Sequence, residues 1–350
     1  MQIRVRSLDN LSLWHSFKLG GTFPWVLDTA RTYEDEPVPM DALYAIMAVA
    51  SASFLLNCLA AVGIALQKKL RRKNTFFIIM LTCLSYAFHA LGVIIYGIKM
   101  VIGYENYRTV FLMTQKDCFC LTLLGSVGKT MIVDFSLITA IDRCIAIFFP
   151  LWYGQRIRFR LVYFKMAIVT AHASISYIIE YVSSSDDALF LCSSFTVVVM
   201  STGMMAMQIE EDVFIVLILI IYVVLLIWVE KELNKAKHDA DNLAHARMQM
   251  KVELLHTLVI SIAFFTLTVA VSNMLTTIGM TEWDYENAIE YVKYAAVGYL
   301  GGIANFAVYY WRTKEIRKSF NYLIITLGRM AVCKFDRKIS VLPTTTSVAM

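Results

Sequence analysis

Long apolar segments that alternate with short charged ones constrain the fold of this chain more than any other feature. A helix needs about 20 apolar residues to cross a lipid bilayer. Segments that reach or approach this length are 42–66, 75–98, 118–141, 161–182, 213–229, 254–279 and 288–310. Hydrophobic residues make up 58% of the 350 residues and charged residues 17%, whereas soluble domains average about 45–50% apolar residues. We therefore predict an all-α integral membrane protein with seven transmembrane helices.

A further segment, 188–209, also lacks charged residues, and its length alone would allow an eighth span. Small and polar residues make it a poorer hydrocarbon segment than the others: Ser193, Ser194, Ser201, Thr202, Gly203 and Gln208. We interpret it as an outer loop that contains a β-rich hairpin over 195–200 and leads into the fifth helix. That helix is then expected to extend upstream of residue 213.

The basic residues gather in every second segment between the predicted spans, and therefore on one side of the membrane. Runs of Lys and Arg follow the first, third, fifth and seventh spans, at 68–73, 156–160, 231–251 and 312–318. Acidic residues gather in the opposite segments, at 34–41, 186–187 and 282–286. Because cytoplasmic loops carry the excess of Lys and Arg, we predict an extracellular N-terminus and a cytoplasmic C-terminus in the plasma membrane. The basic residues cluster beside the spans, so the net charge of +5 does not indicate a nucleic-acid partner.

Both ends of the chain differ in composition from the membrane region. We predict an extracellular tail over 1–40, a membrane domain over 41–323 and a cytoplasmic tail over 324–350. No secretory signal peptide is visible at the start, and Asn10 begins an Asn-x-Ser sequon that could be glycosylated. The membrane domain ends in an amphipathic segment, in which one helical face carries Ile316, Phe320 and Leu323. Such a helix is expected to lie along the inner leaflet rather than to cross it.

A charged motif closes the third apolar segment. It reads Asp142-Arg143-x-x-Ala146-Ile147-x-x-Pro150-Leu151-x-Tyr153. A strongly hydrated charge pair at that depth is costly unless it faces protein, so such residues are functional candidates. The motif resembles the end of the third helix in rhodopsin-like G-protein-coupled receptors.

A second motif closes the seventh segment and strengthens this resemblance. Asn305-Phe306-x-x-Tyr309 resembles the Asn-Pro-x-x-Tyr of the same family, with Phe306 in place of Pro. The run Tyr-Tyr-Trp-Arg that ends at Arg312, followed by Arg-Lys-x-Phe, is most similar to nematode Srsx-type serpentine chemoreceptors.

This resemblance implies a chemosensory receptor that passes an extracellular small-molecule or peptide signal to a heterotrimeric G protein, with arrestin as a further partner. It assigns activation and coupling to Asp142, Arg143, Pro150, Tyr153, Asn305 and Tyr309. In the family the Arg pairs with the neighbouring acid at rest and meets the G protein after activation. Asp142 is therefore the expected resting partner of Arg143.

The resemblance also implies a disulfide at the outer mouth of the third helix. Cys118 lies 25 residues before Arg143, where the family carries a Cys bonded to the second outer loop, and Cys192 lies in that loop. A bond between Cys118 and Cys192 would persist on the oxidising side of the membrane. Cys120 competes with Cys118 for this role, and two free buried thiols are the alternative.

The ligand pocket is expected between the outer halves of the helices. Gly125 occupies the position where amine receptors have Asp, so a biogenic amine is disfavoured. Lys129 lies one turn deeper, and an intramembrane Lys needs a partner or a water-filled cavity. If the fifth helix begins near residue 205, Glu210 and Glu211 lie in its upper part. We expect Lys129 to pair with one of them or with an acidic ligand; backbone carbonyls and water are the alternative.

Several features of the family are missing. All five prolines lie outside the predicted spans, so the family's kinking prolines in the fifth, sixth and seventh helices are absent. The sixth segment reads Phe264-x-x-x-Thr268-x-Ala270, without the usual Trp and Pro. The sodium-site Asp corresponds to Tyr86, so sodium-dependent tuning is not expected. A receptor that folds but does not couple is therefore an alternative function.

No pattern of residues indicates catalysis, a cofactor or a metal site. The segment Gly125-Ser126-Val127-Gly128-Lys129-Thr130 imitates part of a phosphate-binding loop. However, the first Gly of such a loop would fall at position 123, which is Leu123, and the segment lies inside a predicted span.

Two other classes of membrane protein are alternatives. A seven-helix channel of the insect-odorant type would have the orientation opposite to the one that the basic residues predict here. A transporter would show internal repeats and helices broken by Gly or Pro. We see no repeat in this sequence, and no Pro interrupts a predicted span. We therefore prefer a receptor to an enzyme, a channel or a transporter.

Overall fold

The computed structural model describes residues 40–71, 74–107, 113–149, 160–184, 188–189, 202–238, 259–260, 263–274 and 285–326. The chain divides into two units, Met1–Val38 and Pro39–Met350. All of the described residues belong to the second unit.

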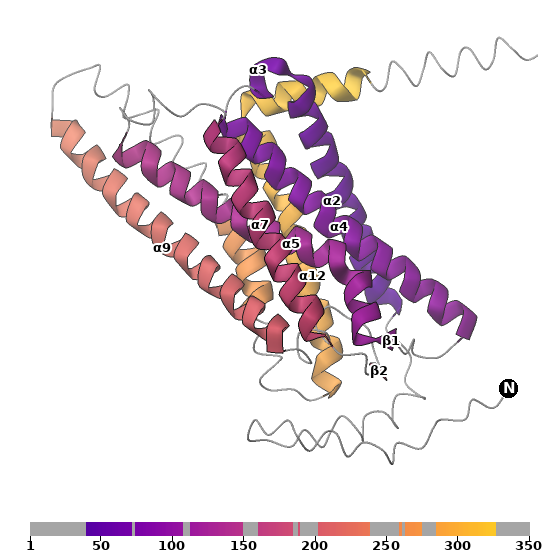
Figure 1. Ribbon diagram of the computed structural model, residues 1–350. Helices are drawn as coiled ribbons and strands as arrows, with labels where there is room; N and C mark the ends of the chain where they lie inside the picture. Colours follow the sequence, from indigo (N-terminus) through magenta and orange to yellow (C-terminus); the bar gives the residue numbers. More distant parts are fainter. Residues whose placement is uncertain are drawn as a thin grey trace, which may run out of the picture. The chain divides into compact units, whose positions relative to one another are not determined.

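Helices occupy each of the predicted spans (Figure 1). Helices in the described part of the chain include α2 (Met40–Leu66), α3 (Lys68–Arg71), α4 (Asn74–Tyr107), α5 (Gln115–Phe148), α7 (Arg160–Ser183), α9 (Thr202–His238) and α12 (Tyr285–Arg312). The sixth span is described as a helix over 263–274, which contains the π-helical turn η2 (Thr266–Ala270). We call 263–274 the sixth helix. The prediction of an all-α chain is thus confirmed.

Three helical segments in the described part of the chain are long and apolar enough by themselves to cross a membrane. They are Leu43–Leu66, Phe76–Ile102 and Ala206–Lys231. Ionisable residues lower the mean hydropathy of α5, α7 and α12, for example Lys129 and Asp134 in α5. The sixth span is apolar, but its described part, Ala263–Met274, is shorter than a full crossing.

The fifth helix begins well upstream of residue 213, as predicted. Helix α9 starts at Thr202, so the last part of segment 188–209 is helical and belongs to the fifth span. Strand β2 (Ala188–Leu189) pairs antiparallel with β1 (Met113–Thr114), directly before α5. The hairpin predicted over 195–200 lies outside the described residues.

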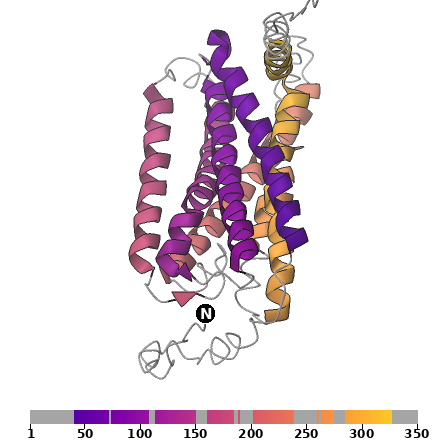
Figure 2. The ribbon, with the colours of Figure 1, turned by 90° about the vertical axis from the view of Figure 1, so that its right-hand side faces the viewer.

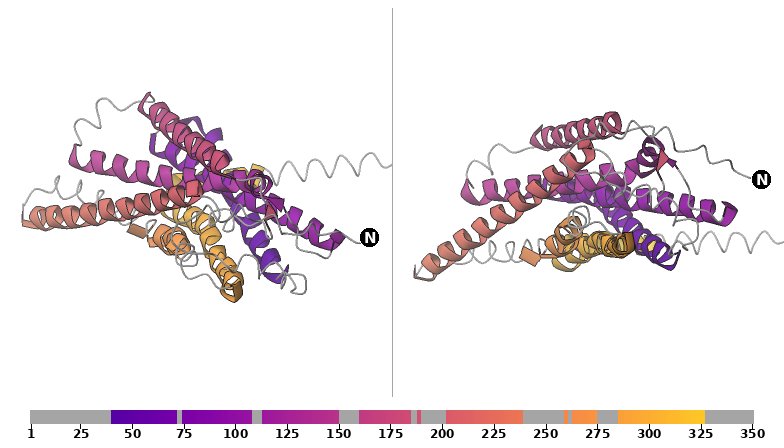
Figure 3. Two further views of the ribbon diagram at one scale, coloured as in Figure 1. Left: turned by 60° about the horizontal axis from the view of Figure 1, so that its bottom comes forward. Right: turned by 90° about the horizontal axis from the view of Figure 1, so that it is seen from below.

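The helices pack in a defined set of neighbours. Helix α4 lies between α2 and α5, α12 packs on α2 and on the sixth helix, and α7 packs on α5 and α9 (Figures 2 and 3). The contact between α4 and α5 is very close, because a Cβ atom on Gly92 would lie 2.2 Å from the backbone nitrogen of Gly125. A Cβ atom on Gly128 would likewise lie 2.4 Å from the backbone nitrogen of His89. Only glycine permits this approach.

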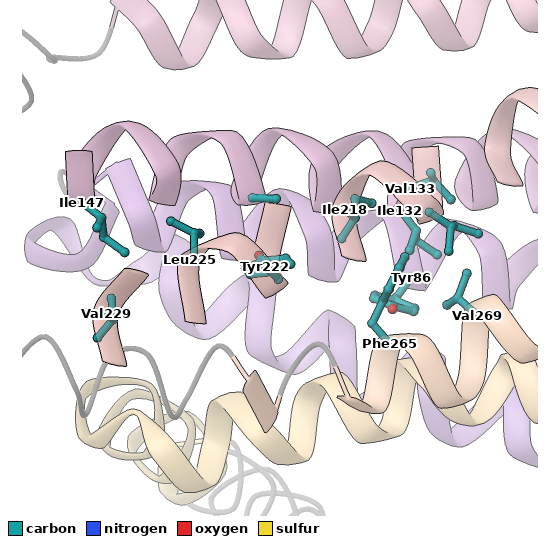
Figure 4. Close-up of a cluster of buried hydrophobic side chains, with 12 residues drawn as sticks. Tyr86, Ile132, Val133, Ile147, Ile218, Tyr222, Leu225, Val229, Phe265 and Val269 are labelled. Atoms are coloured by element: carbon teal, nitrogen blue, oxygen red, sulfur yellow. The ribbon is translucent and has the colours of Figure 1, made fainter. Parts of the chain in front are cut away.

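An apolar cluster fills the interior between α4, α5, α9 and the sixth helix (Figure 4). Its buried members are Tyr86, Ile132, Val133, Ala140, Ile147, Ile215, Ile218, Tyr222, Leu225, Val229, Phe265 and Val269. The cluster runs along the inner half of α5 and ends near Ile147, beside the Asp142–Arg143 motif. This core fixes the position of that motif relative to α9.

A short helix over 314–326 follows α12, and we call it the surface helix. Ile316, Phe320 and Leu323 are all buried, which confirms the predicted apolar face. Ser319 Oγ donates a hydrogen bond of 2.6 Å to the carbonyl oxygen of Gly63, near the end of α2. The surface helix therefore docks on α2 and α12 through one face, while Lys314 and Lys318 are exposed.

Candidate functional site

The Asp142–Arg143 motif lies at the end of α5, where it meets α7. Asp142 is only 2% exposed, and its carboxylate forms an ion pair with Lys165 Nζ of α7. The sequence analysis did not predict Lys165 as the partner of Asp142, because Lys165 lies near the end of its apolar segment. The Nε atom of Arg143 is buried and has no hydrogen-bond partner among the described residues. A charged donor is thus held in the protein interior with bonding capacity left over.

Two tyrosines on other helices lie within electrostatic range of Arg143. Tyr222 of α9 and Tyr309 of α12 both interact electrostatically with the Arg143 guanidinium. The structure therefore brings together Arg143 and Tyr309, which the sequence motifs had singled out separately. Asn305, one helical turn before Tyr309, has a buried Nδ2 atom without a hydrogen-bond partner in the described part of the chain. Pro150 and Tyr153 lie outside the described residues.

Tyr86, which the resemblance sets against the sodium-site Asp of rhodopsin-like receptors, belongs to the apolar cluster. The side chain is 5% exposed and lies beside Phe265 and Val269 (Figure 4). Its ring is so close to α12 that a Cβ atom on Gly302 would lie 3.2 Å from Tyr86 Cδ1. Tyr86 therefore packs closely against α12 as part of the apolar interior.

The sixth helix is irregular although it contains no proline. Its π-helical turn, Thr266–Ala270, coincides with the segment that lacks the family's Trp and Pro. Thr268 Oγ1 donates a hydrogen bond of 2.7 Å to the carbonyl oxygen of Phe264 within this region. A π-helical turn is a recognised cause of helix bending and occurs often at functional sites. The sequence analysis did not predict this turn, because it took only prolines as signs of a bend.

A first polar network links α5 to α9 in the predicted ligand region. Lys129 Nζ lies 2.9 Å from Glu211 Oε2 and donates a hydrogen bond of 2.9 Å to Gln208 Oε1. Thr130 Oγ1 donates a hydrogen bond of 3.0 Å to Glu211 Oε1. Of the two acids proposed as partners of Lys129, the structure therefore places Glu211 against it. Glu210 points to a different partner.

A second polar network joins α5, α7 and α9. His172 Nδ1 lies 2.8 Å from Asp134 Oδ2, and His172 Nε2 lies 3.1 Å from Glu210 Oε1. Sequence reasoning missed the pairing of Asp134 with His172. The available signal was that both residues are ionisable and lie inside apolar spans, where such groups need partners.

Gly125 lies at the contact between α5 and α4. Its carbonyl oxygen accepts a hydrogen bond of 2.8 Å from His89 Nδ1. A Cβ atom on Gly125 would meet its nearest neighbour at 3.8 Å, which is an ordinary contact. Gly125 therefore differs from Gly92, where any side chain would strike the backbone of α5.

Cys118 lies near the start of α5, is fully buried and takes part in a disulfide. Cys120 is a free, exposed thiol, so it is not the bonded member of the two. Cys192, the proposed partner of Cys118, lies outside the described residues, as does Asn10. Pairing of β1 with β2 places the segment that leads to Cys192 beside the start of α5.

Comparison with protein families agrees with this architecture. The family described as serpentine type 7TM GPCR chemoreceptor Srsx matches residues 52–324. No curated protein matches the chain. The matched residues extend from the first span to the surface helix and cover well over half of the sequence. Members of this family are multi-pass membrane receptors and not enzymes. The chain therefore belongs to the serpentine type 7TM GPCR chemoreceptor Srsx family.

Proposed function

We propose that this receptor transduces an extracellular small-molecule or peptide signal to a heterotrimeric G protein. The observation that supports this most is the environment of Arg143. Arg143 is partly buried at the end of α5, its Nε atom lacks a partner among the described residues, and Tyr222 and Tyr309 interact with it electrostatically. A cation with unused donors at the convergence of α5, α9 and α12 is suited to bind carbonyl groups of a helix end.

Activation follows from a shift between two arrangements of the helices. A ligand that binds better to one arrangement raises its population by its differential affinity. We infer that the favoured arrangement moves the inner end of the sixth helix away from Arg143, with the π-helical turn Thr266–Ala270 as the point of bending. This opens a cleft for the C-terminal helix of a G-protein α-subunit. The turn thus takes over the role that a proline has elsewhere in the family.

The ion pair between Asp142 and Lys165 determines how Arg143 is restrained. When Lys165 neutralises Asp142, the acid attracts the neighbouring guanidinium less strongly. We propose that Lys165 shares Asp142 with Arg143 at rest and so lowers the free energy needed to release Arg143 towards a G protein.

The ligand is proposed to bind beside the network of Lys129, Gln208 and Glu211, with Glu210 and Gly125 at its margin. Gln208 has a buried Nε2 atom without a partner among the described residues. Lys129 remains partly accessible, with 30% of its side chain exposed. A ligand with a carbonyl or carboxylate group could accept hydrogen bonds from both side chains.

Topology and processing complete the proposal. We propose that residues 1–40 are extracellular, with Asn10 available for glycosylation, that 41–323 form the receptor domain and that 324–350 form a cytoplasmic tail available to arrestin. We also propose that Cys118 is bonded to Cys192. Epitope tags at the two ends, stained in intact and in permeabilised cells, test the topology: the N-terminal tag should stain in both and the C-terminal tag only after permeabilisation.

Recruitment of G proteins tests the coupling directly. Cells that express the luciferase-tagged receptor and one of a panel of fluorescent G-protein heterotrimers are permeabilised and depleted of nucleotides with apyrase. We expect energy transfer with at least one heterotrimer and a loss of about tenfold for Arg143→Ala. Lys231→Ala, which changes an exposed base on α9, serves as the matched control. Equal recruitment by Arg143→Ala at equal surface expression, or no recruitment of any heterotrimer, would contradict the proposal.

A further inference from the structure

His172 contacts two carboxyl groups at once, one with each ring nitrogen. Asp134 of α5 lies 2.8 Å from Nδ1 and Glu210 of α9 lies 3.1 Å from Nε2. His172 itself belongs to α7, so this single ring connects three helices. We call Asp134, His172 and Glu210 the triad.

Counting protons shows what these contacts require. A neutral imidazole has one N–H donor and one acceptor nitrogen, and an ionised carboxylate has acceptors only. A neutral ring between two carboxylates can therefore form one of the two hydrogen bonds but not both. Both contacts are satisfied only when the triad holds one additional proton, either on the ring or on one carboxyl group. We propose that the triad is a proton-binding site that latches α7 to α5 and α9, so that external pH is an input to this receptor.

The surroundings of the triad favour the additional proton. Asp134 interacts electrostatically with Glu210 and Glu211, so negative charge is concentrated there. Lys129, the nearby Lys of α5, is already paired with Glu211. Without the additional proton the triad would carry two uncompensated negative charges inside the membrane region, which is costly in a medium of low polarity.

Further charged and aromatic groups complete this environment. On α7, Glu180 interacts electrostatically with Glu211 and Lys129. On α9, the ring of Phe214 lies 5.7 Å from the His172 ring, measured between centroids, and covers it with apolar surface.

The triad is not sealed inside the described structure, because the side chains of His172 and Glu210 are 25% and 34% exposed. Glu180 lies near the end of α7 that the charge pattern places outside. It interacts electrostatically with Glu211, which also interacts with Asp134. We infer that protons reach the triad from this end of α7.

Loss of the proton breaks one of the two contacts that hold α7. The latched form is therefore the acidic form, and the contact of α7 with α5 or α9 weakens as pH rises. The effect of this change on signalling rests on the proposed function, whereas proton binding does not.

Thermal denaturation of the purified receptor without G protein tests proton binding. One additional proton bound in the folded state changes the folding equilibrium about tenfold per pH unit over the range in which it is released. We expect the apparent Tm of the wild type to fall as pH rises through this range. In Glu210→Gln the amide donates to His172 Nε2 without an additional proton, so its Tm should depend much less on pH and stay high at alkaline pH.

Two further variants complete the experiment. His172→Phe should have a lower Tm than Glu210→Gln, because both contacts are gone, and its Tm should still fall as pH rises, because Asp134 and Glu210 are then two unpaired carboxyl groups inside the membrane region. Lys231→Ala, which changes an exposed base on α9 outside the triad, is the control and should keep the wild-type slope. A wild-type slope in Glu210→Gln, or a wild type whose Tm does not depend on pH, would overturn the proposal.

Infrared difference spectra recorded during a pH titration give an independent readout that needs no variant to be fully stable. We expect a proton-release signal from carboxyl or imidazolium groups in the wild type and its loss in Asp134→Asn and Glu210→Gln. The same signal in wild type and both variants would show that the proton is held elsewhere. Because both measurements omit the G protein, their result is separate from whether the receptor couples.

Discussion

Helix α5 has two polar regions that differ in how completely they are bonded. Towards α7 and α9, the side chains of Lys129, Thr130, Asp134 and Asp142 all have hydrogen-bond or ion-pair partners. Towards α9 and α12, the Nε atom of Arg143 is buried without one in the described structure. Bonded polar groups fix the relative position of two helices, whereas an unused donor leaves room for a new partner. We infer that the first region holds the bundle together and that the second changes during signalling.

The largest effect is expected from breaking the ion pair at the end of the bonded region. Lys165→Met leaves the buried carboxylate of Asp142 without its partner from α7, and loss of one partner of a buried pair costs about 3–5 kcal/mol. Thermal denaturation of the purified receptor should therefore show a strongly lowered Tm. Adding Asp142→Asn should restore much of the stability, because no unpaired charge remains. If the double variant is as unstable as the single one, the pair is not responsible.

A somewhat smaller effect is expected at the contact of α5 with α4, which uses shape instead of charge. Gly92→Ala would place a Cβ atom 2.2 Å from the Gly125 nitrogen, and overpacking of this kind costs about 1–3 kcal/mol or more. Gly125→Ala is the matched control, because its Cβ atom would lie 3.8 Å from the nearest atom. Denaturation of the two variants should rank Gly92→Ala well below Gly125→Ala. Equal Tm values would show that the helices can separate at this point.

The helical spans and the face of the surface helix could be predicted because they follow from apolar length and periodicity. Ile316, Phe320 and Leu323 show this well, since their spacing alone indicates a buried face. The triad could not be predicted in the same way. Asp134, His172 and Glu210 lie on three helices, and a sequence does not show how those helices are rotated against one another. The π-helical turn was missed because the prediction relied on prolines to mark bends.

A moderate effect is expected in the network of Lys129. Lys129→Met leaves Glu211 and the Gln208 carbonyl without their charged donor, and such hydrogen bonds contribute about 1.5–3 kcal/mol each when buried, less here because Lys129 is partly exposed. We expect a lowered Tm, with partial recovery in Lys129→Met combined with Glu211→Gln. Recovery would show that this network stabilises the folded receptor, in addition to its proposed role in ligand binding. An unchanged Tm and an unchanged surface expression of Lys129→Met would remove the network from the account.

The smallest effect is expected where the surface helix docks, away from both regions of α5. Ser319→Ala removes the hydrogen bond to the Gly63 carbonyl, which contributes about 1 kcal/mol. Lys318→Ala, at the adjacent exposed position, is the control and should leave stability unchanged. Denaturation should separate the two variants by a few degrees. A Tm of Ser319→Ala equal to that of the control would indicate that the apolar face alone holds this helix.

Distances between spin labels test the central claim, that the region around Arg143 rearranges while the bonded region stays fixed. One pair, Phe149→Cys with Ile260→Cys, joins the residue after α5 to a residue shortly before the sixth helix, both exposed, and the other, Ile141→Cys with Ile168→Cys, joins α5 to α7. Both are measured in receptor with the exposed Cys120 replaced by Ser, with and without a nucleotide-free G-protein heterotrimer. We predict that the first distance lengthens and the second does not change. An unchanged first distance in the bound complex, or an equal change in both, would contradict the account.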